Sequence, residues 1–202
     1  MPPYNATDPT ASFLNASCFD FLLIELVPLA YRVTNELELP RDSSSPASPP
    51  PGDTTSPGGA RRLNEEDERE AAAYRLDMLG YRVGQGIVER FSRDRPRFND
   101  TLDVIKFVCK DLWSLVFRKQ IDNLKTNHRG VYVLTDNSFR PISRASTAPG
   151  GQTVAKAAPF LLVPCGIIRG ALAAMGITAT VQADASDLPA AVFQIKTMPT
   201  RS

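Results

Sequence analysis

The sequence predicts an α+β fold, in which a small twisted antiparallel sheet of about four strands carries about four helices packed on one face. Apolar residues recur at helical spacing in four segments, and after Gly130 shorter segments alternate between apolar and polar residues. Stretches rich in proline and serine separate these elements. At 202 residues, the chain has the length of a single domain, which we expect to span 1–202.

The first predicted helix begins at Ser17 and contains Pro28, which we expect to kink it. Its apolar residues surround the helix axis: one stripe holds five of them and three others lie on different sides (Phe19, Leu22, Leu23, Leu26 and Ala30; Phe21, Ile24 and Leu29). A helix that is apolar all round must be covered from two directions. Either a partner subunit covers the second side, or the helix crosses the centre of its own domain. We favour the partner, because the helix is followed by a segment with little to bury.

Three segments are predicted to lie outside the packed domain. Residues 1–14 have the character of a flexible tail, and residues 40–62 form an insert rich in proline and serine that we expect to be disordered. Residues 143–158 are a second, polar loop insert.

The second helix is predicted from Asn64, its N-cap, to about Ser92. The acidic run at residues 65–68 matches the helix dipole, although it could also meet a basic partner. Gly80 and Gly84 lie four residues apart, so they share one face and leave a strip without side chains. The same spacing recurs at residues 166 and 170, and the two pairs predict close helix packing.

A third helix is expected from Asp100 or Thr101 to about residue 119. Two short strands at 131–134 and 139–142, joined by a turn at residues 136–137, predict a hairpin. A fourth helix follows from Pro164 to Gly176, whose glycine suits a helix C-terminus. A second hairpin is predicted from segments 177–184 and 191–196.

The sequence offers little for catalysis. A net charge of +1 provides no strong positive potential that would attract nucleic acid. The single histidine, His128, excludes a metal site with several histidine ligands. Cys165 near a helix start is either a reactive thiol or a small buried residue. The helical glycines lack the lysine and serine or threonine of a phosphate loop. We therefore expect no enzyme activity, no cofactor and no metal.

We expect no export signal at the start of this sequence, because residues 1–17 contain no lysine or arginine. The apolar run at 21–30 is interrupted by Glu25 and Pro28 and is too short to span a membrane. We expect a cytoplasmic protein, or one peripheral on the cytosolic face of a membrane.

Four blocks of sequence, taken in order, carry a resemblance: Phe19–Pro28, Gly80–Gly86, Asp103–Trp113 and Pro164–Leu172. Together they resemble the small subunits of the TRAPP (transport protein particle) tethering complex, in the branch of the yeast thirty-three-kilodalton subunit and mammalian subunit six. The resemblance implies a small twisted antiparallel sheet with helices on one face, which agrees with the elements predicted above.

The resemblance also implies a role as a structural adaptor in traffic between the endoplasmic reticulum and the Golgi. Its expected partner is another TRAPP small subunit, the one most widely shared in the family, and the two would pair through their helical faces. The particle's other subunits would complete an assembly that promotes nucleotide exchange on a Ypt/Rab GTPase at Golgi membranes. The expected partner-binding residues come from the first and second helices: Phe19, Phe21, Leu22, Leu23, Leu26, Gly80, Tyr81, Gly84 and Ile87.

One position departs from the likeness. The expected partner carries an acylated cysteine just before its third helix, and Arg95 occupies that place here, so acylation is not expected. A small-molecule or lipid-binding domain of the same architecture is the alternative function, because related bacterial domains bind ligands under their helices.

Overall fold

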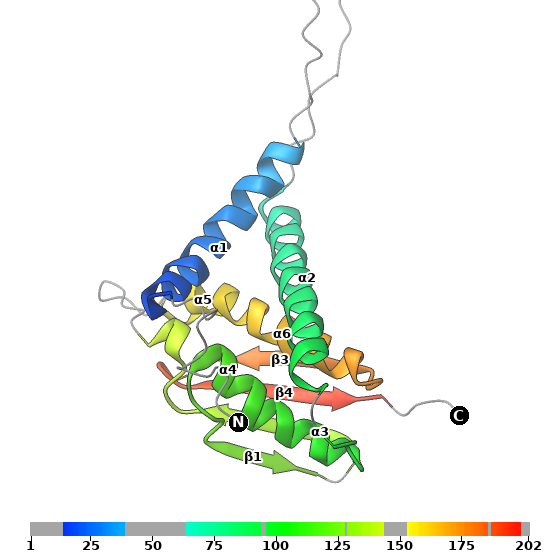
Figure 1. The fold of residues 1–202 in the computed structure, drawn as a ribbon. Helices are drawn as coiled ribbons and strands as arrows, with labels where there is room; N and C mark the ends of the chain where they lie inside the picture. Colours follow the sequence, from blue (N-terminus) through cyan, green and yellow to red (C-terminus); the bar gives the residue numbers. More distant parts are fainter. Residues whose placement is uncertain are drawn as a thin grey trace, which may run out of the picture.

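The computed structural model describes residues 14–38, 64–93, 96–127, 129–143, 153–185 and 187–198. The predicted tail, apart from Leu14, and the predicted insert at 40–62 lie outside the described residues. Within them, a four-stranded antiparallel sheet and four main helical segments confirm the predicted fold class (Figure 1).

The sheet contains strands β1 (Asn123–Thr126), β2 (Val131–Asp136), β3 (Ala179–Asp184) and β4 (Ala191–Thr197), in the order β1-β2-β4-β3. All neighbours are antiparallel. The pleat sends alternate residues to opposite faces, and the buried face carries Tyr132, Leu134, Ala191, Phe193 and Ile195. The hairpin predicted from 177–184 and 191–196 is confirmed by the pairing of β3 with β4.

The first predicted hairpin is wrong. β2 pairs with the preceding strand β1, and Arg140–Ile142 forms a 3₁₀ turn, η2, in place of a strand. Phe139 and Ile142 are both buried at a spacing of three, which suits a turn, and the Phe139 N–H donates to the carbonyl of Pro189 at 2.9 Å. The sequence pattern did not predict strand β1, because β1 is a short edge strand with a mostly polar sequence.

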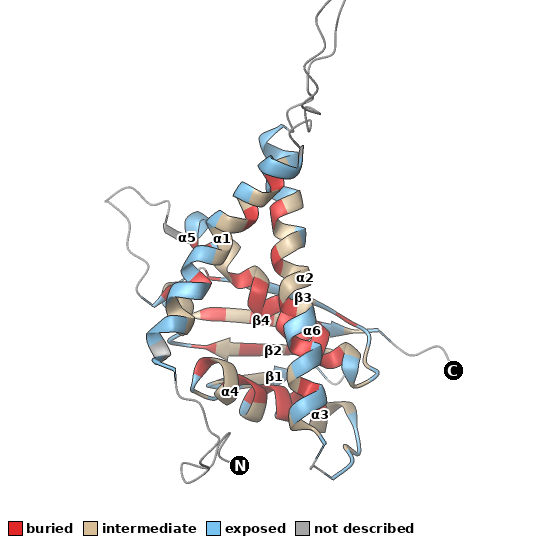
Figure 2. Ribbon diagram, turned by 45° about the horizontal axis from the view of Figure 1, so that its top comes forward, coloured by how far each residue is buried: buried red, intermediate tan, exposed pale blue. Residues whose placement is uncertain are grey.

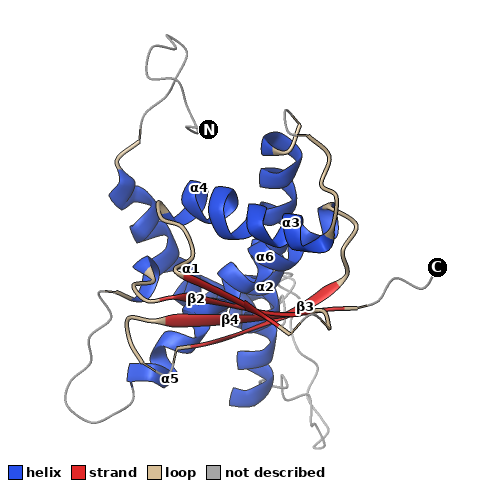
Figure 3. Ribbon diagram, turned by 90° about the horizontal axis from the view of Figure 1, so that it is seen from below, coloured by secondary structure: helices blue, strands red, loops and turns tan. Residues whose placement is uncertain are grey.

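The third predicted helix is present but is not uniform. It comprises α3 (Thr101–Phe107), a π-helical stretch η1 (Val108–Leu112) and α4 (Trp113–Phe117). Its N-cap is Asp100, whose side chain accepts from the N–H of Asp103 at 2.7 Å. Figure 3 shows α3 and α4 on one side of the sheet, and there the rings of Phe117, Phe139 and Phe193 surround Trp113.

The last helix begins earlier than predicted. A short helix α5 (Thr153–Ala157) and a 3₁₀ turn η3 (Ala158–Leu161) lead into α6 (Leu162–Ala174), so the C-terminal part of the predicted loop 143–158 is helical. The predicted terminal glycine is confirmed: Gly176 has φ +77°, and the N–H of Ile177 reaches the carbonyl of Leu172 at 2.9 Å.

The stretch Val154–Ala174 is long and apolar enough to cross a membrane, but 61% of its most apolar part is buried in the domain. It therefore has the character of a core helix. α6 packs along β3 on one side and against the long helix α2 (Glu65–Phe91) on the other (Figure 1).

α2 and α6 meet through the two glycine pairs. A Cβ added at Gly80 or Gly84 would lie 2.2 or 2.1 Å from a carbonyl oxygen of α6. A Cβ added at Gly166 or Gly170 would lie 2.1 or 2.0 Å from a carbonyl oxygen of α2. No side chain fits in this space, so the four glycines let two backbones touch, which confirms the predicted close packing.

Candidate interaction surface

The first helix, α1 (Ala16–Glu38), lies at the edge of the domain and presents two different sides (Figure 2). Its inner side carries Leu23 and Ala30, which are buried in the core shared with α2 and α6. Its other side, the outer α1 face, consists of Cys18, Phe21, Leu22, Ile24 and Pro28, all exposed. α1 is therefore covered from one direction only and does not cross the centre of the domain.

The outer α1 face is unusually apolar for a surface. Phe21 is 69% exposed, and Leu22 and Ile24 are each 54% exposed. The charged pair on this side, Glu25 and Arg32, is itself exposed, with 3.8 Å between Glu25 Oε1 and Arg32 Nη1. Contiguous exposed apolar side chains of this kind mark interaction sites in proteins.

A groove between α1 and α2, of about 470 Å³, continues this surface. Leu22, Leu26, Leu29 and Val33 follow one another at spacings of four, three and four residues, and the last three line the groove. The stripe therefore joins the outer α1 face to the α1–α2 groove. The opposite wall comes from α2 and includes Arg75, Leu76, Met78, Leu79 and Arg82.

Polar contacts attach α1 to the domain at both ends. Near its start, Arg140 Nη2 in η2 donates to Asp20 Oδ2 at 2.7 Å. Near its end, Arg75 Nε donates to the buried Thr34 hydroxyl at 3.0 Å, and Asn35 Nδ2 donates to Glu68 Oε1 at 2.7 Å. These contacts keep the outer α1 face pointing away from the domain.

The structure divides the nine residues that were expected to bind a partner. Phe21 and Leu22 are exposed and Leu26 lines the groove, so these three lie on the candidate surface. The remaining residues from the two helices pack inward, namely Phe19, Leu23 and Ile87.

The other three expected residues belong to the contact between α2 and α6. Gly80 and Gly84 are buried against the backbone of α6 and are out of reach of a partner. Tyr81 lies beside them, with the guanidinium of Arg169 at 4.5 Å from its ring centre. Arg169 also donates to Asp77, so this cluster fastens α2 to α6.

Sequence reasoning missed Ile24 and the arginines of the groove. Ile24 was recognised as apolar but was not assigned to the interface. Helical periodicity could have grouped it with Phe21, because the two lie three residues apart. Arg75 and Arg82 carried no signal in the sequence that distinguished them from solvated surface residues.

The cysteines behave as structural residues where they are buried. Burial raises the pKa of Cys109 to about 12. Burial and the charge of Asp77 raise the pKa of Cys165 to about 12, which favours the small buried residue over the reactive thiol. Cys18 is exposed on the outer α1 face. His128 and Arg95 lie outside the described residues.

The described residues contain no group of three or more His, Cys, Asp or Glu side chains placed to hold a metal ion. The buried carboxylate of Asp136 accepts hydrogen bonds from Trp113 Nε1 at 2.9 Å, from Lys119 Nζ at 2.5 Å and from the N–H of Ser138 at 3.0 Å. This network joins α4 to the end of β2 and has a structural role.

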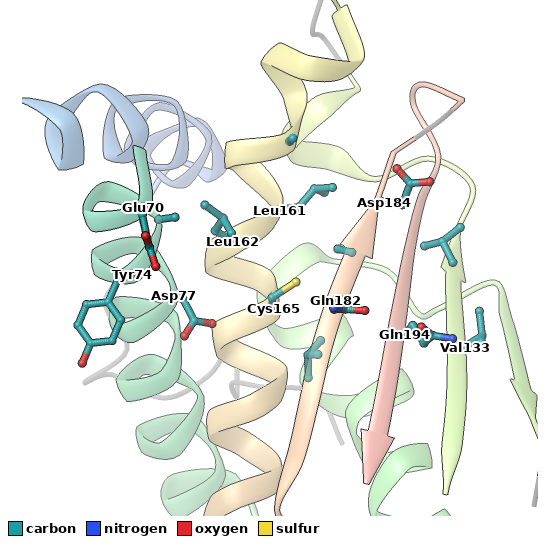
Figure 4. A pocket seen from close by; sticks show the side chains of 15 residues that line it. Glu70, Tyr74, Asp77, Val133, Leu161, Leu162, Cys165, Gln182, Asp184 and Gln194 are labelled. Atoms are coloured by element: carbon teal, nitrogen blue, oxygen red, sulfur yellow. The ribbon is translucent and has the colours of Figure 1, made fainter. Parts of the chain in front are cut away.

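A second hollow, which we call the sheet–helix trough, lies between α2, α6 and the neighbouring strands and measures about 820 Å³ (Figure 4). Tyr74, Asp77, Cys165, Gln182 and Gln194 are among its lining residues. Tyr74 and Gln182 are exposed, so the hollow is an open surface feature.

The structure is thus an α+β domain with helices on an open antiparallel sheet and one apolar helix left at its surface. The chain belongs to the family of transport protein particle (TRAPP) components, which it matches over residues 19–198.

Among its relatives, trafficking protein particle complex subunit 6b of Danio rerio is 52% identical over 121 residues, covering 60% of this chain and 76% of the relative. The human subunit 6B is 50% identical over 121 residues, covering 60% of this chain and 75% of the relative. An uncharacterised protein of Schizosaccharomyces pombe is 35% identical over 186 residues, covering 92% of this chain and 65% of the relative.

The fold has a counterpart among solved structures. A trafficking protein particle complex subunit 3 from Naegleria fowleri, covalently bound to palmitic acid, superposes with a TM-score of 0.59. The alignment covers 92% of this chain and 98% of that chain, at 14% identity. At this identity the likeness concerns the fold alone.

Proposed function

We propose that the chain is a non-catalytic adaptor subunit of a TRAPP-type vesicle-tethering complex. It pairs with another small subunit of the same family through the outer α1 face and the α1–α2 groove. The observation that carries the proposal is the exposure of Phe21, Leu22 and Ile24 on a helix whose opposite side is buried.

The magnitude of burial supports pairing. Burying a fully exposed large apolar side chain contributes about 1.5–3 kcal/mol, and Phe21, Leu22 and Ile24 are 69%, 54% and 54% exposed, so the three together contribute roughly 3–5 kcal/mol. Association costs at least about 4 kcal/mol in lost motion, and the groove residues therefore have to contribute as well. A partner that inserts an apolar helix into the α1–α2 groove covers the outer α1 face and also buries the groove residues.

In this role the chain acts only within the assembly. Nucleotide exchange on a Ypt/Rab GTPase belongs to the whole particle, and membrane contact at the Golgi is peripheral. Family membership and the likeness to subunits 6A and 6B support this placement.

Co-expression with the family's most widely shared small subunit tests the proposal. The pair should elute as a 1:1 complex in size-exclusion chromatography with light scattering, and the chain alone should self-associate. A stable monomer that does not bind the co-expressed subunit contradicts the proposal. Exchange activity of the isolated chain above background contradicts the adaptor role.

The ligand-binding alternative gains no support from the trough. The hollow is open, and the carboxylates of Glu70, Asp77 and Asp184 line it. An acyl chain requires an enclosed apolar channel, and carboxylates oppose a fatty-acid headgroup.

A further inference from the structure

The sheet–helix trough has an apolar floor between two polar walls. The floor comes from α6, η3 and the strands; the α2 wall carries Glu70 and Tyr74, and the strand wall carries Asp184 and Gln182 (Figure 4). The apolar lining residues include Ala73, Val133, Ala158, Leu162 and Val192.

The charged residues that line the trough are all acidic. Three carboxylates line it, from Glu70, Asp77 and Asp184, and none of its described lining residues is lysine, arginine or histidine. Asp77 is neutralised by Arg169 of α6. Glu70 and Asp184 are exposed and form no ion pair with any described residue. Two unpaired negative charges therefore line the trough, one on the α2 wall and one on the strand wall.

The α2 wall adds an aromatic ring to its carboxylate. Tyr74 follows Glu70 by one helical turn, so the two side chains lie on the same side of α2, and Tyr74 is 66% exposed. A carboxylate beside an open aromatic ring suits a guanidinium or ammonium group, which pairs with the first and stacks on the second. On the opposite wall, the paired strand residues Gln182 and Gln194 offer amide groups for hydrogen bonds.

We propose that the sheet–helix trough is a second docking surface, which binds a basic segment of another protein chain that also carries apolar residues. Arginine or lysine side chains of the segment pair with Glu70 and Asp184, and its apolar side chains lie on the floor. This surface goes beyond the pairing proposed for α1. The two hollows share only Tyr74, which stands on the ridge of α2 between them.

A designed peptide tests the docking surface on the full chain. The probe is a short fluorescein-labelled peptide of alternating arginine and leucine, and binding is followed by fluorescence anisotropy. The charge-reversed variant Glu70→Lys/Asp184→Lys should bind it at least about tenfold more weakly. The matched control Glu36→Lys/Glu89→Lys, which changes the same charge at exposed sites outside the trough, should stay within about twofold of wild type. All four substituted side chains are exposed, and circular dichroism checks that both variants fold.

Two further peptides complete the test. A glutamate–leucine peptide should bind the reversed variant better than it binds wild type, and an arginine–serine peptide should bind wild type more weakly than the leucine form. Hydrogen exchange should show protection of β3 and of α2 around Tyr74.

Equal affinity of both double variants overturns the proposal. Protection at the acidic start of α2 (residues 65–68), or equal affinity for the serine peptide, overturns it too, because general charge attraction would then explain binding. Trough-dependent binding of phosphatidylserine vesicles would assign the surface to a membrane and also overturn it.

Discussion

Asp20 and Arg140 lie 120 residues apart in sequence and meet in space, with Arg140 Nη2 donating to Asp20 Oδ2 at 2.7 Å. The contact ties the first turns of α1 to η2, beside the aromatic cluster around Trp113. Together with the burial of Leu23 and Ala30, it helps to fix which side of α1 faces the domain, because Asp20 is half-buried while Phe21 and Ile24 are exposed.

Breaking this pair should loosen α1 without unfolding the domain. The two side chains are 33% and 22% exposed, so solvent screens part of the interaction, and Arg140→Ala should cost about 1 kcal/mol of folding stability. Amide exchange should accelerate in residues 17–24 and stay unchanged in α2. A double-mutant cycle with Asp20→Ala measures the coupling, and a coupling of zero would show that the pair does not hold the helix.

Gly84 and Gly86 offer a matched test of the contact between α2 and α6. Gly84→Ala places a Cβ 2.1 Å from the carbonyl oxygen of Ile167, so the helices must separate at a cost of about 1–3 kcal/mol. Gly86→Ala meets nothing within 4 Å and should stabilise the helix by about 1 kcal/mol. Urea unfolding of both variants compares them. Equal effects would refute the backbone contact.

Lys119 supports the buried carboxylate of Asp136. Burial disfavours the ammonium of Lys119, but hydrogen bonds to Asp122 and Asp136 outweigh it and raise the pKa of Lys119. Lys119→Met leaves Asp136 buried without its cation and should cost about 3 kcal/mol. Lys106→Met removes an exposed pair with Asp103 and should change stability by less than about 1 kcal/mol. Thermal unfolding distinguishes the two, and similar losses would show that the network is not essential.

Thiol labelling reports on the outer α1 face. With pKa values near 12, Cys109 and Cys165 hold almost no thiolate at mildly alkaline pH, and both are buried. Iodoacetamide should therefore modify Cys18 alone in the folded chain and all three cysteines in urea. In the complex with the partner subunit, Cys18 should be protected. Unchanged labelling of Cys18 in the complex would place the partner elsewhere.

The close packing of two helices could be predicted from the sequence because glycine is costly in a helix. Gly80 and Gly84, matched by Gly166 and Gly170, had to be compensated by a contact that needs them. Strands β3 and β4 were predicted because one of their faces is buried and the other is not, which leaves a period of two in the sequence.

Other features left a weaker trace or none. Phe139 and Ile142 are as apolar as strand residues, and the one signal against a strand was Pro141 between them, which cannot donate a ladder hydrogen bond. On α1, Leu23 and Ile24 are equally apolar, so periodicity could not tell the buried side from the exposed one. Long-range contacts such as that of Asp20 with Arg140 fix that orientation, and a contact across 120 residues is not visible in a local pattern.

The most direct test of the account is the affinity of the partner subunit for a chain with the double substitution Phe21→Glu/Ile24→Glu, measured by isothermal titration calorimetry. Both residues are more than half exposed, so the domain should keep its stability while binding weakens by at least about a hundredfold. The control Met198→Glu, which changes an apolar residue of similar exposure at the end of the sheet, should bind as wild type. Wild-type affinity in the α1 double variant would contradict the claim that this helix is the pairing surface.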